Sequence, residues 1–274
     1  MTLQNSNIDL KNNKKLSVQV TLSGLSFLVT NLITKELVYF SEKILPQTTT
    51  PEELLIILQN SFSETLELQG LFNEVVIIYA TELYSIVPTS LFEESKASEY
   101  LKFNSKILAN DFIAFDQLEN NDITIVYIPF VNINNYLFDR FGHFNYYHSN
   151  TLLLKYLLKK DKHYSLPKVY INVYVNSFDI IVINNGKLSL CNSYTYKTPE
   201  DFIYYILFCL EQLKLNPDTI DLVLSGLIEK NNDNYNILFN YVRNVSFSTY
   251  KKELILNTSE SKSVHRNLIL KLVD

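Results

Sequence analysis

Apolar and polar residues alternate in the first part of the chain with a period of two, which is typical of β-strands. The apolar positions of the first two runs are Leu16, Val18, Val20 and Leu22, then Leu25, Phe27 and Val29. Between the runs stand Ser23 and Gly24, and both residue types favour turns. Two alternating strands joined by a two-residue break predict a β-hairpin. A second turn near Thr34 leads to a third strand, so residues 15–45 predict a three-stranded meander.

The same pattern returns in residues 168–196. The apolar positions of this second copy are Val169, Ile171, Val173 and Val175, then Phe178, Ile180 and Val182. Its polar break consists of Asn176 and Ser177, and its second turn contains Gly186. The second copy therefore predicts the same meander as the first.

A helix and a further strand follow each meander. The first helix opens with Thr50-Pro51-Glu52-Glu53 and the second with Thr198-Pro199-Glu200-Asp201. Thr is favoured at the N-cap, Pro at the first helical position, and acidic residues in the first turn. Continuous apolar runs at residues 74–79 and 219–224 then predict strands that are covered on both faces, as in parallel sheets. Because the order strand-strand-strand-helix-strand occurs twice, we interpret the repeat as a duplication.

The stretch between the two copies predicts additional elements. They are a helix from Pro88 to about Phe103, strands at 112–116 and 123–128, a helix at 131–140, a strand at 144–148 and a helix at 151–159. The second copy continues with a helix near 235–243, a strand near 245–247 and a tail. We therefore expect an α/β fold with two lobes. Residues 1–166 form the N-terminal lobe, with inserted helices and a hairpin at about 88–148, and residues 167–274 form the C-terminal lobe.

Composition narrows the class of protein. Of 274 residues, 47% are hydrophobic and 19% are charged, which supplies buried cores and excludes global disorder. The net charge of -5 argues against nucleic-acid binding, which requires a basic surface. Two cysteines, Cys191 and Cys209, are too few for a disulfide framework or a zinc site. The first ten residues are polar, and no apolar run approaches the roughly 20 residues that span a bilayer, so we expect a cytoplasmic protein without a transmembrane segment.

The order of elements resembles the ribonuclease H-like unit, two of which form the actin-like ATPase superfamily. The segment Val87-Pro-Thr-Ser-Leu-Phe92, followed by an acidic helix, is similar to an uncharacterised actin-like family of Bacteroidota. The resemblance covers nearly the whole chain and implies two tandem ribonuclease H-like lobes. It also implies a nucleotide site between the lobes, where an Asp-x-Gly-type hairpin of each lobe approaches the phosphates. The nearest functional analogues are actin-like scaffolds of pilus assembly and type II secretion.

The positions that match this nucleotide site lack the expected residue types. The corresponding hairpins are Gln19–Gly24 and Asn172–Ser177, and neither has a carboxylate in its first strand. The candidate cleft positions are Ser23, Gly24, Asn176, Ser177 and Gly226, the last standing where the family's ATPases carry a Gly-Gly-type adenosine loop. Because loss of a metal-binding carboxylate slows phosphoryl transfer by orders of magnitude, we expect no catalytic residue, no metal site and no ATPase or kinase activity.

Our leading hypothesis is a non-catalytic actin-like scaffold, or protein-interaction module, that binds a protein partner and no cofactor. The alternative is a nucleotide-dependent switch or ATPase that binds ATP through atypical cleft residues. A third hypothesis is a small-molecule sensor that uses the same cleft.

Other residues with possible chemistry leave alternatives open. His143 and His148 are five residues apart, which suits a shared metal ion poorly on a strand or a helix, so partly buried or surface histidines are expected. Asp111, Asp116 and Asp122 flank an apolar strand and a turn; paired carboxylates can act in acid-base chemistry, but turn formation is the expected role. The aromatic residues at 136–147 are expected to pack in a core, with an interface as the alternative.

Overall fold

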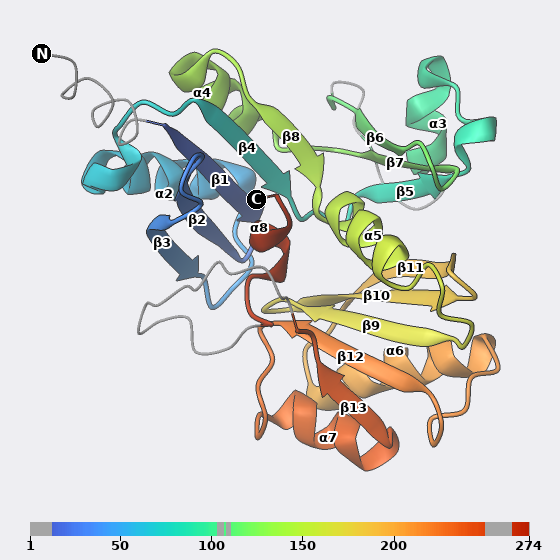
Figure 1. The fold of residues 1–274 in the computed structure, drawn as a ribbon. Helices are drawn as coiled ribbons and strands as arrows, with labels where there is room; N and C mark the ends of the chain where they lie inside the picture. Colours follow the sequence, from blue (N-terminus) through green and yellow to red (C-terminus); the bar gives the residue numbers. More distant parts are fainter. Residues whose placement is uncertain (1–12, 103–106, 108–110, 250–264, 274) are drawn as a thin grey trace, which may run out of the picture. The chain divides into compact units, whose positions relative to one another are not determined.

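The structure of this chain is a computed structural model that describes residues 13–102, 107, 111–249 and 265–273 (Figure 1). The chain divides into two compact units. Among the described residues, the first unit contains 13–152 and 269–273, and the second contains 153–249 and 265–268. A five-stranded sheet forms the centre of each unit.

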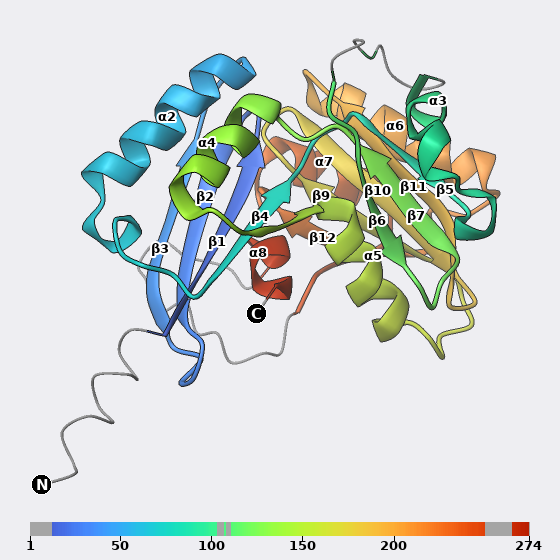
Figure 2. The ribbon, with the colours of Figure 1, turned by 90° about the horizontal axis from the view of Figure 1, so that it is seen from above.

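The sheet of the first unit has the strand order β3-β2-β1-β4-β8. Its strands are β1 (Lys14–Thr21), β2 (Gly24–Asn31), β3 (Leu37–Ile44), β4 (Glu74–Tyr79) and β8 (Asn145–His148). The first three strands form the predicted antiparallel meander, and β4 pairs in parallel with β1 and β8. Its main helices are α2 (Pro51–Glu64) and α4 (Val131–Phe141), which Figure 2 shows next to one another along this sheet. Phe27 of β2 meets Phe62 of α2 edge-on, with ring centroids 5.8 Å apart.

The sheet of the second unit repeats this plan in the order β11-β10-β9-β12-β13. Its strands are β9 (Lys168–Val173), β10 (Ser177–Asn184), β11 (Lys187–Thr195), β12 (Asp221–Gly226) and β13 (Asn244–Phe247), and its helices are α6 (Pro199–Gln212) and α7 (Asp233–Tyr241). The strand directions match those of the first unit. Even the register agrees, since Lys15 pairs with Glu74 in one unit and Lys168 with Asp221 in the other. The predicted order β-β-β-α-β is thus confirmed in both copies.

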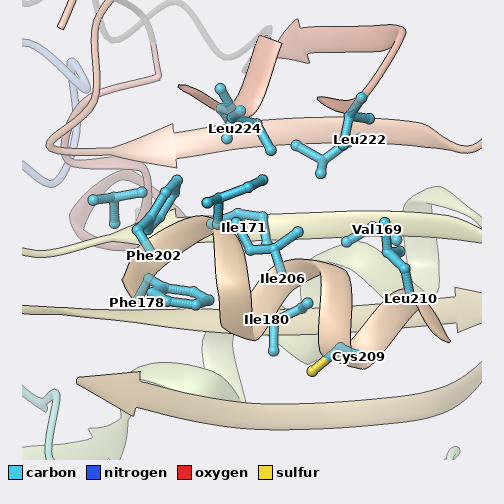
Figure 3. Packing of buried hydrophobic residues seen from close by; sticks show 14 of the residues in the cluster. Val169, Ile171, Phe178, Ile180, Phe202, Ile206, Cys209, Leu210, Leu222 and Leu224 are labelled. Carbon is cyan, nitrogen blue, oxygen red and sulfur yellow. The ribbon is translucent and has the colours of Figure 1, made fainter. Parts of the chain in front are cut away.

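Figure 3 shows the core of the second unit, where α6 packs on the apolar face of the sheet. Phe202, Ile206 and Leu210 of the helix are at most 1% exposed. They recur every four residues, so they lie on one face of the helix. Phe202 meets Phe178 of β10 edge-on at 4.9 Å. Full burial of each such side chain stabilises the fold by about 1.5–3 kcal/mol. Cys209 is 3% exposed in the same cluster, where its thiol fills space.

Both predicted helix starts are capping boxes. In the first unit the Glu53 N–H donates to the Thr50 hydroxyl at 3.3 Å, and the Thr50 N–H donates to the Glu53 carboxylate at 3.2 Å. In the second unit Thr198 and Asp201 make the same two bonds, both at 3.2 Å. Each box satisfies two backbone groups that the first turn of a helix leaves unpaired.

The insertion of the first unit follows β4. It comprises β5 (Tyr84–Val87), β6 (Ala114–Leu118) and β7 (Ile123–Tyr127) in the sheet order β5-β7-β6, with α3 (Ala97–Lys102) and two 3-10 turns at Thr89–Leu91 and Glu94–Lys96. The predicted continuous helix from Pro88 is therefore wrong over its first part, and its expected end at Phe103 lies outside the described residues. In the first of these turns, the carbonyl and carboxylate of Asp122 accept the backbone N–H groups of Thr89 and Ser90 at 3.2 and 2.8 Å.

Two more helices complete the described chain. The predicted helix at 151–159 is α5 (Ser149–Lys160), whereas α8 (Leu268–Leu272) was not predicted.

The end of the described chain contacts β1 in the first unit. The ammonium group of Lys15 forms an ion pair with Glu74 at 3.0 Å and donates to the carbonyl of Val273. The polar segment at residues 1–10 lies outside the described residues. Of the helices in the described ranges, none has both the length and the apolar character that a membrane crossing demands.

Candidate functional site

The hairpin of the first unit has its turn one residue earlier than the predicted break at Ser23 and Gly24, and Gly24 begins β2. Thr21 pairs with Gly24 across the hairpin, so the turn itself consists of Leu22 and Ser23. The Ser23 N–H donates to the Thr21 hydroxyl oxygen at 3.2 Å. The Thr21 hydroxyl donates in turn to the Gly24 carbonyl at 3.1 Å. The Thr21 side chain therefore hydrogen-bonds both the Ser23 N–H and the Gly24 carbonyl at this turn.

Gly24 is required by the neighbouring strand. A Cβ atom at this position would lie 2.5 Å from the carbonyl oxygen of Lys43, far inside van der Waals contact. Gly24 pairs with Ile44 in β3, and the Leu45 N–H donates to the Ser23 carbonyl at 2.9 Å. The end of β3 thus packs directly on the hairpin, and this packing explains the glycine without a ligand.

The hairpin of the second unit holds Asn176 and Ser177. The Ser177 carbonyl accepts a hydrogen bond from the Tyr174 N–H at 2.8 Å, and the Asn176 carbonyl accepts one from the Tyr196 N–H at 2.9 Å. The Tyr174 hydroxyl donates at 3.0 Å to Asp179, a carboxylate of β10 that is only 4% exposed. Sequence reasoning missed Asp179, because a carboxylate was sought in the first strand of each hairpin and this one lies in the second.

Gly226 ends β12 in a left-handed conformation, with φ of 84°. A Cβ atom here would lie 2.2 Å from the carbonyl oxygen of Val173 and 2.8 Å from its nitrogen. The Gly226 N–H donates to the His265 carbonyl at 3.1 Å, and the next residue, Leu227, donates to the Val173 carbonyl at 2.7 Å. Close approach of β9 therefore explains this glycine too.

An anion-binding loop presents backbone N–H groups to its ligand. Two of the candidate positions use such groups within their own unit, because Ser23 donates to Thr21 and Gly226 donates to His265.

A buried carboxylate organises a second polar cluster, in the first unit. Asp116 of β6 accepts hydrogen bonds from the His148 N–H at 2.8 Å and the Thr151 hydroxyl at 2.6 Å on one oxygen. Its other oxygen accepts the Tyr127 hydroxyl at 3.3 Å. Burial raises the pKa of Asp116 to about 6, although the three hydrogen bonds act in the opposite direction. The carboxylate ties the inserted sheet to the junction of β8 and α5.

His148 is fully buried beside this carboxylate. Its Nδ1 accepts the Asn150 N–H at 3.1 Å, so the proton resides on Nε2, which lies 3.0 Å from the carbonyl oxygen of Thr81. The rings of Tyr84 and Tyr127 pack against the imidazole, with centroids 4.7 and 5.2 Å away. Burial lowers the pKa of His148 to about 4, so the ring is neutral near pH 7.

The structure corrects two expectations about these residues. Asp116 does not form a turn, because it lies inside β6, whereas Asp122 does stand in a turn, with φ of 54°. His148 is neither partly buried nor on the surface, but His143 is exposed. Across the residues that the structure describes, no three histidine, cysteine, aspartate or glutamate side chains gather in a way that could hold a metal ion.

The aromatic residues at 136–147 pack mainly into the first unit. Phe141 contacts the ring of Phe62 at 5.7 Å, and Tyr146 contacts that of Tyr79 at 6.4 Å. Phe138 differs from them, since 60% of it is exposed. Core packing, the expected role, therefore holds for the two rings that make these contacts.

Solved structures of the actin-like ATPase fold are similar to this chain. A Bacteroides thetaiotaomicron protein with this fold and unknown function matches with a TM-score of 0.81 and 22% identity, over 100% of this chain and 98% of that one. A chain of the PilM-PilN type IV pilus biogenesis complex matches with a TM-score of 0.52 and 12% identity, over 86% and 88%. The cytoplasmic domain of EpsL, an inner membrane component of the Vibrio cholerae type II secretion system, reaches 0.47 and 10%, over 95% and 93%. Among curated proteins, none matches.

The fold predicted from the two repeated units is thus confirmed as a mixed α/β fold of the actin-like ATPase type. The predicted resemblance to an uncharacterised actin-like family is confirmed as well. A family model described as "Protein of unknown function (DUF3822)" matches residues 3–245, which is most of the chain, and the protein therefore belongs to the DUF3822 family.

Proposed function

We propose that this protein is a non-catalytic actin-like scaffold that binds a protein partner. The observation that carries the proposal is the chemistry of the two hairpins, considered one at a time. Their first strands contain no carboxylate. The N–H group of Ser23 in the first hairpin, and that of Gly226 at the end of β12, donate to acceptors within their own units. Binding of a metal-nucleotide complex requires both a carboxylate for the metal and backbone donors for the phosphates.

The first strand of each hairpin carries an amide in place of an acid. Gln19 and Asn172 stand at equivalent positions of the two copies, and they are 8% and 5% exposed. The Asn172 side-chain oxygen accepts the hydroxyl of Ser225 at 2.9 Å. An amide oxygen is a weaker ligand for Mg²⁺ than a carboxylate, because it brings no negative charge. Retention of the fold without this charge favours a binding role over catalysis.

A protein partner is consistent with the occurrence of this fold in a protein complex. The matched chain of the PilM-PilN type IV pilus biogenesis complex belongs to a protein assembly, and it shares only the fold with this chain. We propose a cytoplasmic location for the scaffold, because two cysteines are too few for the disulfide framework of a secreted domain.

Isothermal titration calorimetry of the full chain with Mg-ATP at millimolar concentration tests the proposal. We expect no saturable heat of binding. Saturable binding of Mg-ATP would refute the proposal that the scaffold binds no nucleotide. A phosphate-release assay on the same samples then separates the two remaining functions, because a nucleotide-dependent switch binds ATP without turnover and an ATPase releases phosphate.

A further inference from the structure

The helices of the second unit expose an unusual number of aromatic side chains. Four large aromatic residues are exposed there, two on α6 and two on α7: Tyr204 at 61%, Phe208 at 42%, Phe239 at 55% and Tyr241 at 54%. Both helices contribute to one core cluster with the sheet, so they cover the same face of it. We call Tyr204 and Phe208, the two exposed rings of α6 that stack on one another, the aromatic helix face.

Several of these rings are held in place by neighbouring rings. Tyr204 and Phe208 lie one helical turn apart and stack at 6.3 Å, with 20° between their planes. Tyr204 also meets Tyr205 edge-on at 5.4 Å, and Tyr205 stacks on Tyr194 of β11 at 4.7 Å. Rings that are already fixed lose little conformational entropy when a partner covers them.

The core does not need these rings. The opposite side of α6 supplies the buried residues Phe202, Ile206 and Leu210, as Figure 3 shows. The corresponding helix of the first unit, α2, exposes Ile56 but no aromatic residue, since its one aromatic side chain, Phe62, is 1% exposed. The exposed rings of α6 are therefore a property of this helix and not of the duplicated helix as such.

The charge of the two helices indicates what covers the rings. Their acidic residues are Glu200, Asp201, Glu211 and Asp233, and neither helix contains a lysine, arginine or histidine. Helical spacing places Glu200 one turn before Tyr204 and Glu211 about one turn after Phe208. Lys197 and Lys214 lie outside α6, beyond its two ends.

Ring faces attract cations, and flanking carboxylates strengthen that attraction. The same negative charge disfavours nucleic acid and anionic membranes.

We propose that the aromatic helix face docks a lysine- or arginine-rich segment of a partner protein, with cationic side chains seated on the rings of Tyr204 and Phe208. This inference rests on the proposed scaffold function and assigns it a surface and a partner chemistry.

Selection of short random peptides displayed on phage, with the full chain as bait, tests the inference. We expect the enriched peptides to contain lysine and arginine in excess and to bind more weakly as salt rises. The double variant Tyr204→Ser/Phe208→Ser should raise their dissociation constants at least about tenfold, which corresponds to about 1.4 kcal/mol. The double variant Glu200→Gln/Glu211→Gln should weaken binding chiefly at low salt.

Matched controls come from the first unit. Ile56→Ser/Leu66→Ser removes two exposed apolar side chains, and Glu52→Gln/Glu64→Gln neutralises two exposed carboxylates of α2. Both control variants should bind the peptides as the unchanged chain does. Circular dichroism of every variant verifies that it is folded.

Three outcomes would overturn the inference: no enrichment of basic peptides, enriched peptides that bind the aromatic variant as well as the unchanged chain, or self-association in sedimentation that the aromatic variant abolishes. The last outcome would make a second copy of the chain the occupant. Equal binding to the aromatic variant leaves the scaffold standing and removes only this surface, whereas saturable ATP binding would refute the scaffold itself.

Discussion

Replacement of Asp116 by asparagine should expose a pH dependence of stability that the unchanged chain largely cancels. In the folded chain, one Asp116 oxygen accepts the His148 N–H and the Thr151 hydroxyl, and the other accepts the Tyr127 hydroxyl. An asparagine can keep all three contacts, because its carbonyl oxygen accepts the first two and its amide donates to the tyrosine oxygen. The substitution therefore removes the charge with little change in packing.

The magnitude follows from the pKa of Asp116, which burial raises from 3.8 to about 6. Since the folded state holds this proton more tightly than the unfolded state, stability is greatest below pH 3.8 and falls as the pH rises toward 6. One pKa unit corresponds to 1.36 kcal/mol, so the ionised carboxylate costs about 3 kcal/mol above pH 6.

His148 acts in the opposite direction. Burial lowers its pKa from 6.5 to about 4, so the folded state favours the neutral ring. Its contribution is complete above pH 6.5 and is lost as the pH falls toward 4, by about 3 kcal/mol. Protonation of Nδ1 would also break the hydrogen bond from Asn150. Between pH 4 and 6.5 the two effects nearly offset one another in the unchanged chain.

Urea unfolding followed by far-UV circular dichroism, at several pH values from 4 to 7.5, measures the effect. Asp116→Asn should match the unchanged chain near pH 4 and exceed its unfolding free energy by up to about 3 kcal/mol above pH 6.5. His148→Gln should show the opposite trend relative to the unchanged chain. Asp139→Asn, on an exposed residue of α4, should change stability by less than about 0.5 kcal/mol at each pH. If Asp116→Asn destabilises the chain equally at pH 4 and pH 7.5, the buried charge is not the cause and the reasoning fails.

Two further substitutions test local structure. Gly226→Ala should destabilise the second unit by several kcal/mol in urea unfolding, because the new Cβ would lie 2.2 Å from the Val173 carbonyl oxygen at a residue whose φ is 84°. The control is Gly70→Ala, where a new Cβ meets no atom within 4 Å. Equal unfolding midpoints for the two variants would contradict the expected strain at Gly226. Thr198→Ala should lower the unfolding free energy by about 1 kcal/mol, because it removes the hydroxyl that accepts the Asp201 N–H in the capping box. An unchanged midpoint would show that this hydrogen bond contributes no stability.

The sequence predicted the elements whose signals are local. The meanders follow from alternation with a period of two, and the starts of α2 and α6 follow from Thr-Pro followed by two acids. β5 was missed because it is four residues long and follows β4 closely. α8, Leu268–Leu272, has five residues, too few for a helical period to show. Both depend on tertiary contacts that no local pattern records.

The buried polar cluster could not be predicted for a similar reason. Asp116 stands near the end of an apolar run and before a turn, which is where surface carboxylates also occur. Its partners His148 and Thr151 are 32 and 35 residues further along the chain. Only the fold brings them together. A carboxylate at the end of a predicted strand, with threonine and tyrosine as potential donors elsewhere, was the one available signal, and it is a weak one.

The duplication provides an internal test of what the hairpin glycine means. The position of Gly24 in the first copy is occupied by Ser177 in the second, although the strands around them pair in the same way. If glycine were kept at this turn so that a phosphate could approach, as the actin-like resemblance implies for both lobes, both copies would need it. Glycine is present in the copy where the carbonyl of Lys43 would lie 2.5 Å from a Cβ atom. The position is therefore set by the packing of β3, and a glycine in such a turn is not by itself evidence for a nucleotide.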